Sequence, residues 1–265
     1  MKILGILNIT EDSFSDGGKY LEPSAALAHA RELAGDADIL DIGAASSNPE
    51  SAGVAPEIEI VRLESVVPLL QRENITLSID TFSPEVQRWA LAQNVAYLND
   101  IQGFPDEKLY PELAASSANL IVMHSVQERG RATRIDVPRS EILERIRRFF
   151  ASRISALTKA GIARERIILD PGMGFFLGTN AETSFTVLRA LPALKAEFGL
   201  PLLVSVSRKS FLRRITGREP SEAGSASLAA ELFAAARGAD FIRTHDPEAF
   251  RDGLAVWQAL SGNKP

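Results

Sequence analysis

The chain has 265 residues, of which 45% are hydrophobic and 24% charged, and it contains no cysteine. This is the composition of an ordinary globular protein, and the lack of cysteine excludes disulfides, thiolate nucleophiles and cysteine-ligated metal centres. The net charge of −5 argues against nucleic-acid binding through a broad basic face, so an anionic ligand should meet a local group of Arg, Lys and His. The segment "MKILGILNIT" is too short and too soon polar for a signal peptide, so we expect a cytoplasmic protein that does not enter a membrane.

Short apolar runs recur along the whole chain. Each is nearly continuous in hydrophobicity, which is typical of parallel strands that are covered on both faces. The runs predict eight strands, at residues 3–9, 37–43, 76–81, 96–101, 119–125, 166–172, 201–207 and 240–245.

Helical patterns lie between these runs. One predicted helix ends at Gly161, and its apolar face is formed by Ile142, Ile146, Phe149, Phe150, Ile154 and Leu157. Ser83-Pro84 and Asp246-Pro247 have the form of an N-cap followed by a first-turn proline. The alternation of strand and helix, with no domain linker, predicts a single-domain TIM (β/α)8 barrel over residues 1–265; a doubly wound sheet is the alternative.

In such a barrel, functional side chains gather where the strands end. A single polar residue at a strand end is often only a turn or a helix cap, but here all eight predicted strands end in polar groups. These groups are Asn8, Asp41, Asp80, Asn99 with Asp100, His124, Asp170, Ser207 with Arg208 and Lys209, and Arg243 with His245.

These polar groups fall into two chemical sets. Asp80, Asn99 and Asp170 suit a flat heterocycle with an N–C–N donor edge, because a carboxylate accepts two parallel hydrogen bonds from such an edge. The second set suits an anion such as phosphate and comes from the first and last strands, which are neighbours in a closed barrel: Asn8, Arg243 and His245. Taken alone, an arginine here could equally form a structural salt bridge and a histidine could cap the next helix.

Seven strings together resemble the dihydropteroate synthases, in order and over nearly the whole chain. They are "GILNITEDSFSDGG" (5–18), "DIGAASSNP" (41–49), "SIDT" (78–81), "LNDI" (98–101), "LDPGMGF" (169–175), "SRKSF" (207–211) and "RTH" (243–245). The resemblance implies a folate-pathway barrel that condenses 6-hydroxymethyl-7,8-dihydropterin pyrophosphate with p-aminobenzoate and releases pyrophosphate. It also implies a homodimer.

Residue roles follow from the same resemblance, position by position. The pterin would be held by Asp80, Asn99, Asp170 and Lys209. The pyrophosphate would be held by Asn8, Arg243 and His245 together with Mg²⁺, for which Asn8 would be the protein ligand. The p-aminobenzoate would meet Ser47, Pro49, Lys209 and Ser210.

The loop "DPGMGFFLG" departs from the pattern of the family, which has one Phe here followed by Gly-Lys. A second departure is "SSN" at 46–48, where Thr and Arg usually follow the Ser. Both departures resemble the sulfonamide-resistant variants of the family. The hypothesis is that the extra ring, either Phe175 or Phe176, projects toward the bound arylamine and clashes with the bulkier sulfonamide; the alternative is that it packs under the loop as core.

Two other functions remain open at this point. A pterin-binding methyltransferase domain would share the barrel and the Asp and Asn contacts, but it has no pyrophosphate to hold, and "SRK" and "RTH" speak against it. A catalytically silent pterin-binding protein would not be expected to keep an intact anion site.

Overall fold

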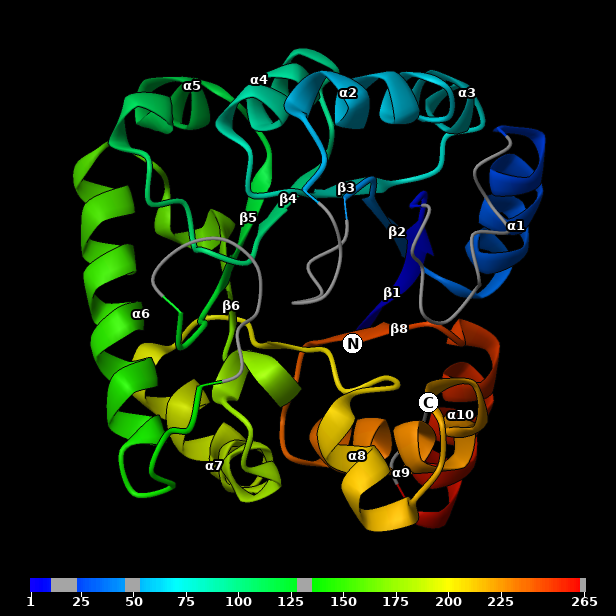
Figure 1. The fold of residues 1–265 in the computed structure, drawn as a ribbon, viewed down its shortest axis with the longest axis vertical. Coiled ribbons are helices and arrows are strands. Elements are labelled where there is room, and N and C mark those ends of the chain that lie inside the picture. The colour runs from blue at the N-terminus through cyan, green and yellow to red at the C-terminus, as the bar shows by residue number, and fades with distance from the viewer. Residues whose placement is uncertain (11–22, 46–52, 128–134, 263–265) are drawn as a thin grey trace.

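The computed structural model describes residues 1–10, 23–45, 53–127 and 135–262, and within them it has eight parallel strands arranged as a barrel (Figure 1). The strands run in the order β6-β5-β4-β3-β2-β1-β8-β7. Their bounds are β1 Lys2–Asn8, β2 Ile39–Gly43, β3 Leu77–Asp80, β4 Tyr97–Asp100, β5 Asn119–Met123, β6 Ile167–Asp170, β7 Leu203–Val204 and β8 Phe241–Thr244. All eight predicted strands are therefore confirmed, and the doubly wound alternative is wrong.

Helices surround the strands on the outside, as Figure 1 shows. The α-helices are α1 Pro23–Asp36, α2 Pro56–Glu64, α3 Val67–Arg72, α4 Pro84–Ala92, α5 Tyr110–Ala115, α6 Ile142–Lys159, α7 Ala181–Phe198, α8 Ser210–Thr216, α9 Gly224–Ala236 and α10 Pro247–Leu260. Four short 3-10 turns complete the list: η1 Glu107–Leu109, η2 Arg164–Arg166, η3 Gly174–Leu177 and η4 Pro220–Glu222. Within the described ranges, no helix has the length and apolarity needed to cross a membrane.

The predicted helix signals are confirmed. The side chain of Ser83 accepts a hydrogen bond from the Val86 amide, and that of Asp246 accepts one from the Ala249 amide, so both residues cap their helices. Helix α6 buries the predicted face, except that Phe149 is only half-buried, and Gly161 follows it at a φ of +92°.

The barrel closes between β6 and β7 through one isolated bridge, which pairs Leu169 with Leu202. Strand β7 is shorter than the predicted run of 201–207, because only Leu203 and Val204 pair with β8. Pro201 has no amide hydrogen to donate, and Arg208 takes a left-handed φ of +57°, which turns the chain out of the strand direction.

Two apolar layers give the barrel its shape. The larger one lies between the strands and the outer helices. The smaller one fills the barrel interior with one residue from most strands: Leu4, Ile39, Tyr97, Ile121, Ile168, Leu203 and Phe241. We refer to these seven residues as the apolar floor, because the polar residues of the next layer lie above them.

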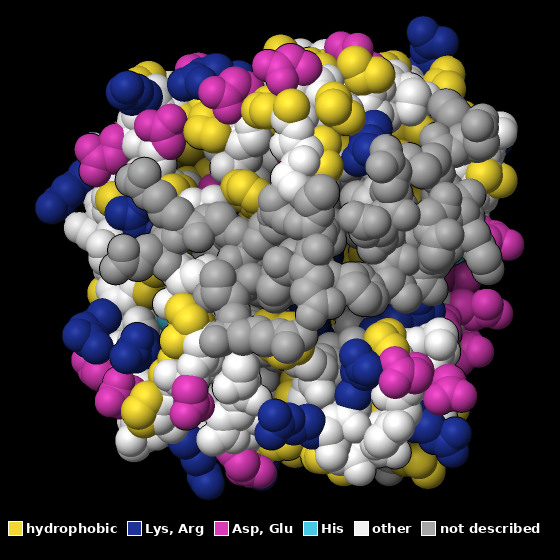
Figure 2. All heavy atoms as spheres, in the orientation of Figure 1, with side chains coloured by type: hydrophobic (Ala, Val, Ile, Leu, Met, Phe, Trp, Pro, Cys, Tyr) yellow, Lys and Arg dark blue, Asp and Glu magenta, His cyan; other side chains and the backbone are white. Residues whose placement is uncertain are grey.

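Figure 2 shows the molecule from the same side as Figure 1. In the part of this face that the structure describes, basic and acidic side chains are mixed around the periphery.

Candidate active site

A strand alternates its side chains with a period of two, so the residue two places beyond a floor residue points into the barrel again. By this rule, the residues that point into the barrel two places after Ile39, Tyr97, Ile168 and Phe241 are Asp41, Asn99, Asp170 and Arg243. Asp41, Asn99 and Asp170 are buried, and the side chain of Arg243 is 12% exposed. The barrel fold itself therefore places a layer of polar residues directly on the apolar floor.

Arg243 lies at the centre of this polar layer. Its Nε donates to Asp41 Oδ2, and its Nη2 donates to Asp80 Oδ2 at 2.7 Å. Asn99 also donates to Asp41 Oδ2, at 3.1 Å. Two buried acceptors beside these bonds, Asp41 Oδ1 and Asn99 Oδ1, have no hydrogen-bond partner among the residues described.

The carboxyl groups of Asp80 and Asp170 have unusual pKa values. Burial raises the pKa of Asp80 to about 7, against the opposing effect of the Arg243 charge. Burial likewise raises the pKa of Asp170 to about 6, although the Gly172 amide donates to it at 2.8 Å. A ligand that donates hydrogen bonds to such buried carboxyl groups stabilises their ionised forms, so these groups are candidates for ligand binding.

Lys209 reaches the same layer from the N-terminus of α8. Burial and the Arg243 charge lower its pKa to about 8, while the charges of Asp170 and Asp80 act in the opposite direction. Its Nζ lies 5.1 Å from the centroid of the Phe176 ring. A β-carbon on Gly174 would lie 3.5 Å from the β-carbon of Lys209, so the loop after β6 packs against this lysine.

Asn8 ends β1 beside this group. A β-carbon on Gly43 would lie 3.6 Å from Asn8 Oδ1 and 3.9 Å from the β-carbon of Asp80, so Asn8 and Asp80 flank this glycine. The described residues contain no cluster of three His, Asp or Glu that could enclose a metal ion. A single amide oxygen fits Mg²⁺, which usually keeps several waters and takes its remaining ligands from phosphate.

His245 follows β8 and contacts the loop after β7. Its Nδ1 lies 3.0 Å from Ser207 Oγ, and its backbone amide donates to the same oxygen at 3.3 Å. Burial lowers the pKa of His245 well below its ordinary value, and the nearby charges of Arg208, Arg243 and Lys209 lower it further. Those same cations make the neighbourhood favourable for an anion.

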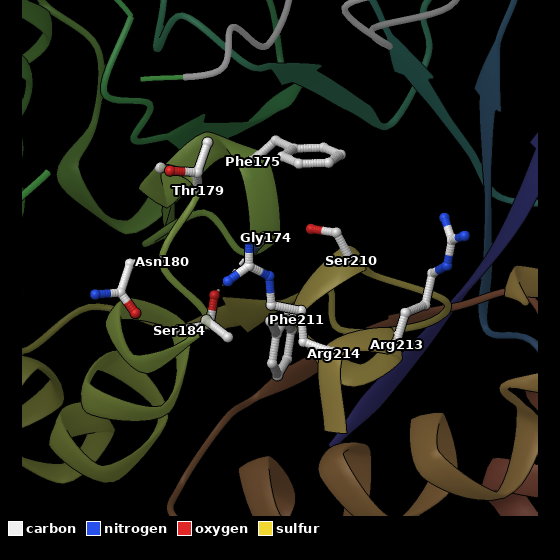
Figure 3. A pocket seen from close by; sticks show the side chains of 11 residues that line it. Gly174, Phe175, Thr179, Asn180, Ser184, Ser210, Phe211, Arg213 and Arg214 are labelled. Atoms are coloured by element: carbon white, nitrogen blue, oxygen red, sulfur yellow. Dashed lines mark hydrogen bonds between the residues drawn. The ribbon is translucent and has the colours of Figure 1, made fainter. Parts of the chain in front are cut away.

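A cavity of about 420 Å³ lies between the loop after β6, the start of α7 and helix α8 (Figure 3), and none of the polar-layer residues is among those that line it. Phe175 borders it from the loop and Ser210 borders it from the helix. Phe176, by contrast, is buried with Ile101 and Met123. Phe175 also packs against this small core, so the two neighbouring rings differ in that only Phe175 borders the cavity and only Phe176 is fully buried.

The structure brings most of the predicted site residues to one end of the barrel. Arg243 does not stand apart with the anion set, as the sequence interpretation had placed it, but bridges to the carboxylates of the other set. Ser47 and Pro49 lie outside the described residues. Asp41 was recognised as a strand end but not as a site residue, although its string "ILDIG" has the same form as "LSIDT".

The sequence and the barrel are similar to those of known proteins. A family model described as "Pterin binding enzyme" matches residues 4–245, so the chain belongs to the pterin-binding enzymes. The type-2 dihydropteroate synthase of Escherichia coli is 57% identical over 259 residues, which cover 97% of this chain and 95% of the relative. The type-3 enzyme of Escherichia coli is 49% identical, with coverage of 98% and 99%.

Among solved structures, dihydropteroate synthases are similar to this chain in fold and in sequence. The dihydropteroate synthase of Xanthomonas albilineans with 4-aminobenzoic acid has a TM-score of 0.87 and 38% identity, over 98% of this chain and 93% of that one. The Yersinia pestis enzyme in a sulfonamide complex has a TM-score of 0.90 and 32% identity, over 98% and 94%. Within its family the chain is therefore an enzyme of the dihydropteroate synthase group, a transferase of folate biosynthesis.

Proposed function

We propose that the chain joins 6-hydroxymethyl-7,8-dihydropterin pyrophosphate to p-aminobenzoate in the cytoplasm, giving 7,8-dihydropteroate and pyrophosphate. The observation that carries this proposal is the pair of unpartnered buried acceptors, Asp41 Oδ1 and Asn99 Oδ1, beside the carboxyl groups of the polar layer. Buried acceptors are costly unless a donor reaches them. The pterin ring supplies a row of N–H donors along one edge.

The pterin in this proposal rests among Asp80, Asn99, Asp170 and Lys209. Hydrogen bonds from the ring to Asp80 and Asp170 favour their ionised forms and thus offset the burial that raises both pKa values. The ionised carboxylates then face the positive charge that spreads over the ring as the leaving group departs.

The diphosphate in this proposal meets Asn8, His245 and Arg243. The Nε and Nη2 atoms of Arg243 are already engaged by carboxylates, but Nη1 has no partner among the described residues and can donate to an anion. Mg²⁺, held through Asn8 and phosphate oxygens, would neutralise charge on the departing group. The cationic surroundings of His245 act in the same direction.

The reaction needs no strong base from the protein. The bond from the pterin methylene to the diphosphate oxygen breaks, and the amine nitrogen of p-aminobenzoate forms a bond to that methylene. The amine then loses its proton to water. The chain contributes by positioning the two reactants and stabilising the charges that develop, a mechanism that requires no covalent intermediate with the protein.

We place the p-aminobenzoate at the side of the site where Phe175 and Ser210 border the cavity. The Xanthomonas albilineans neighbour was solved with 4-aminobenzoic acid, and the Yersinia pestis neighbour with a sulfonamide drug. In this chain the Phe175 ring is half-buried and borders the cavity, so of the two candidate rings we assign Phe175 to the rejection of sulfonamides. A planar carboxylate passes the ring, whereas a tetrahedral sulfonyl group with a further substituent collides with it.

We also propose that two copies associate through the outer face of α10. Val256, Trp257 and Leu260 lie on neighbouring positions of that helix and are 61%, 44% and 83% exposed. An exposed group of large apolar side chains is typical of a surface that another protein covers. A homodimer would cover it with the same face of a second copy.

Purified chain should release pyrophosphate only when both the pterin pyrophosphate and p-aminobenzoate are present. Asp80→Asn should lower this rate by at least about a hundredfold, because it removes a charge that faces the developing cation. Expression of the chain should also restore growth to a strain without its own dihydropteroate synthase. Release that does not depend on p-aminobenzoate, or no release at all, would instead favour the methyltransferase domain or the silent pterin-binding protein.

A further inference from the structure

A serine at the end of β7, outside the groups assigned above, has a buried hydroxyl group. Ser205 directly follows the last residue of the strand, Val204, and is 7% exposed. Its Oγ atom has no hydrogen-bond partner among the described residues. Burial of a hydroxyl group without a partner costs free energy, so its place in the barrel should show which partner completes it.

The packing of its neighbours shows that the side chain of Ser205 points into the barrel. Val204 and Val206, on either side of it, belong to the apolar layer between the strands and the outer helices. Leu203 belongs to the apolar floor inside the barrel. Since side chains alternate between the two faces, Ser205 faces the interior, two residues beyond Leu203.

The layers of the barrel place Ser205 at the level of Asp80. Each layer in the interior of such a barrel holds four side chains, which alternate strands contribute. At the floor, the odd-numbered strands contribute Leu4, Ser78, Ile121 and Leu203. Two residues further along, the same four strands contribute Ile6, Asp80, Met123 and Ser205. Because β3 and β7 are four strands apart in the ring, Asp80 and Ser205 lie on opposite sides of the interior.

Two basic residues are the neighbours of Ser205. In the register of β7 with β8, the position one residue beyond the last pair matches Ser205 with Arg243. The amide of Lys209 donates to the carbonyl oxygen of the residue after Ser205 at 3.2 Å, so the chain turns back directly after the strand. Ser205 Oγ forms no hydrogen bond with either of these two side chains. The hydroxyl group thus lies on the basic side of the site, opposite the carboxyl group of Asp80.

The ring of the proposed substrate has two chemically different edges. One edge carries N–H donors, which suit the unpartnered acceptors Asp41 Oδ1 and Asn99 Oδ1. The other edge carries the ring carbonyl group, whose oxygen has two lone pairs and needs donors. Lys209 can supply one of these donors, and the hydroxyl group of Ser205 can supply the second.

We propose that Ser205 is a further pterin-binding residue, whose hydroxyl group donates a hydrogen bond to the carbonyl oxygen of the ring. This inference rests on the proposed function, because it takes the pterin as the ligand of the polar layer. It assigns the β7 side of the interior to the acceptor edge of the ring. It also gives a role to the first serine of the string "LLVSVS", whose second serine, Ser207, accepts from the His245 amide.

Ser205→Ala tests the proposal because it removes the hydroxyl group and little else. The Kd for 6-hydroxymethylpterin, measured by calorimetry, should rise roughly fivefold, which is the effect of one lost hydrogen bond. The KM for the pterin pyrophosphate should rise with it, while the KM for p-aminobenzoate stays unchanged. The urea midpoint of the ligand-free protein should stay the same or rise, because the variant removes a buried group that has no partner. A lower midpoint would show that the hydroxyl group has a structural role and would contradict the proposal.

Ser78→Ala is the matched control for this experiment. Ser78 Oγ is also buried without a partner among the described residues, but it lies at the level of the floor, below the polar layer. This variant should change the urea midpoint in the same direction as Ser205→Ala and leave the Kd for 6-hydroxymethylpterin unchanged. A wild-type Kd in Ser205→Ala, or an equal rise in both variants, would overturn the proposal. If the wild-type protein itself does not bind 6-hydroxymethylpterin, the result counts against the proposed function instead.

Discussion

Asp170 is a carboxyl group in a place that disfavours its charge. Its pKa rises from 3.8 to about 6 on folding, mainly through burial. The folded state therefore holds this proton more tightly than the unfolded chain does. The stability that the group contributes is complete below about pH 4 and is lost as the pH rises through about 6.

Asp170→Asn should therefore unfold at a higher urea concentration than the wild type at pH 8. The advantage should grow between about pH 4 and about pH 6 and reach on the order of 3 kcal/mol. Pterin binding should be lost at the same time, since a functional charge is removed. Asp252→Asn on the exposed side of α10 is the control, and an equal gain at all pH values in Asp170→Asn would contradict the assignment.

Phe175 carries the prediction on drug selectivity. Phe175→Ala should lower the inhibition constant for sulfamethoxazole at least tenfold, because the clash at the cavity is removed, while the KM for p-aminobenzoate changes less. Phe176→Ala should instead mainly reduce stability, by about 3 kcal/mol or more, because that ring is buried. An unchanged inhibition constant in Phe175→Ala would retire the hypothesis.

At this scale the sequence shows which strand ends are polar, but not how they pair. That Arg243 binds Asp41 and Asp80 depends on how β8 and β3 face each other across the barrel, which no local string contains.

At the scale of secondary-structure elements and loops, the conformation of the loop after β6 depends on Gly172. The φ of Gly172 is +74°, and a β-carbon there would lie 2.3 Å from the backbone oxygen of His124. Relief of that contact would shift the loop that carries Phe175. The amide of Val126, which donates to Phe176 O at 3.0 Å, would have to move with it.

Gly172→Ala should lose more stability than Gly199→Ala and should raise the KM for p-aminobenzoate. Gly199 is a matched control, because its φ is +58° but its β-carbon would meet nothing within 4 Å. The control should cost about 1 kcal/mol for the left-handed backbone alone. Equal denaturation midpoints for the two variants would show that the contact with His124 is relieved without cost.

For the molecule as a whole, the proposed dimer can be tested on α10. Trp257→Glu combined with Leu260→Glu should convert the protein to a monomer in sedimentation velocity, because it places charge in an apolar contact. Ile215→Glu is the control, since that residue is 67% exposed but belongs to α8. A double variant that sediments like the wild type would assign these side chains to no interface.

The overall fold was the most predictable level. Apolar runs at eight places, separated by helices, leave little choice once the connections between parallel strands must be helical. The first and last residues of each strand were harder to predict from the sequence than the strand itself, as β7 illustrates. It ends at Val204, because only Leu203 and Val204 pair with β8, and the run of apolar residues does not record where pairing with a neighbouring strand stops.

The single bridge between Leu169 and Leu202 has a consequence for substrate traffic. Local opening costs least where the fewest hydrogen bonds must break. That joint separates the strand leading to Asp170 and Phe175 from the strand leading to Lys209 and Ser210, whereas β3 and β4, which bear Asp80 and Asn99, are joined to each other and to β2 by continuous ladders. We therefore expect the barrel to open locally on the side of Phe175 and Ser210, which would admit the proposed arylamine, while Asp80 and Asn99 keep their places on the other side.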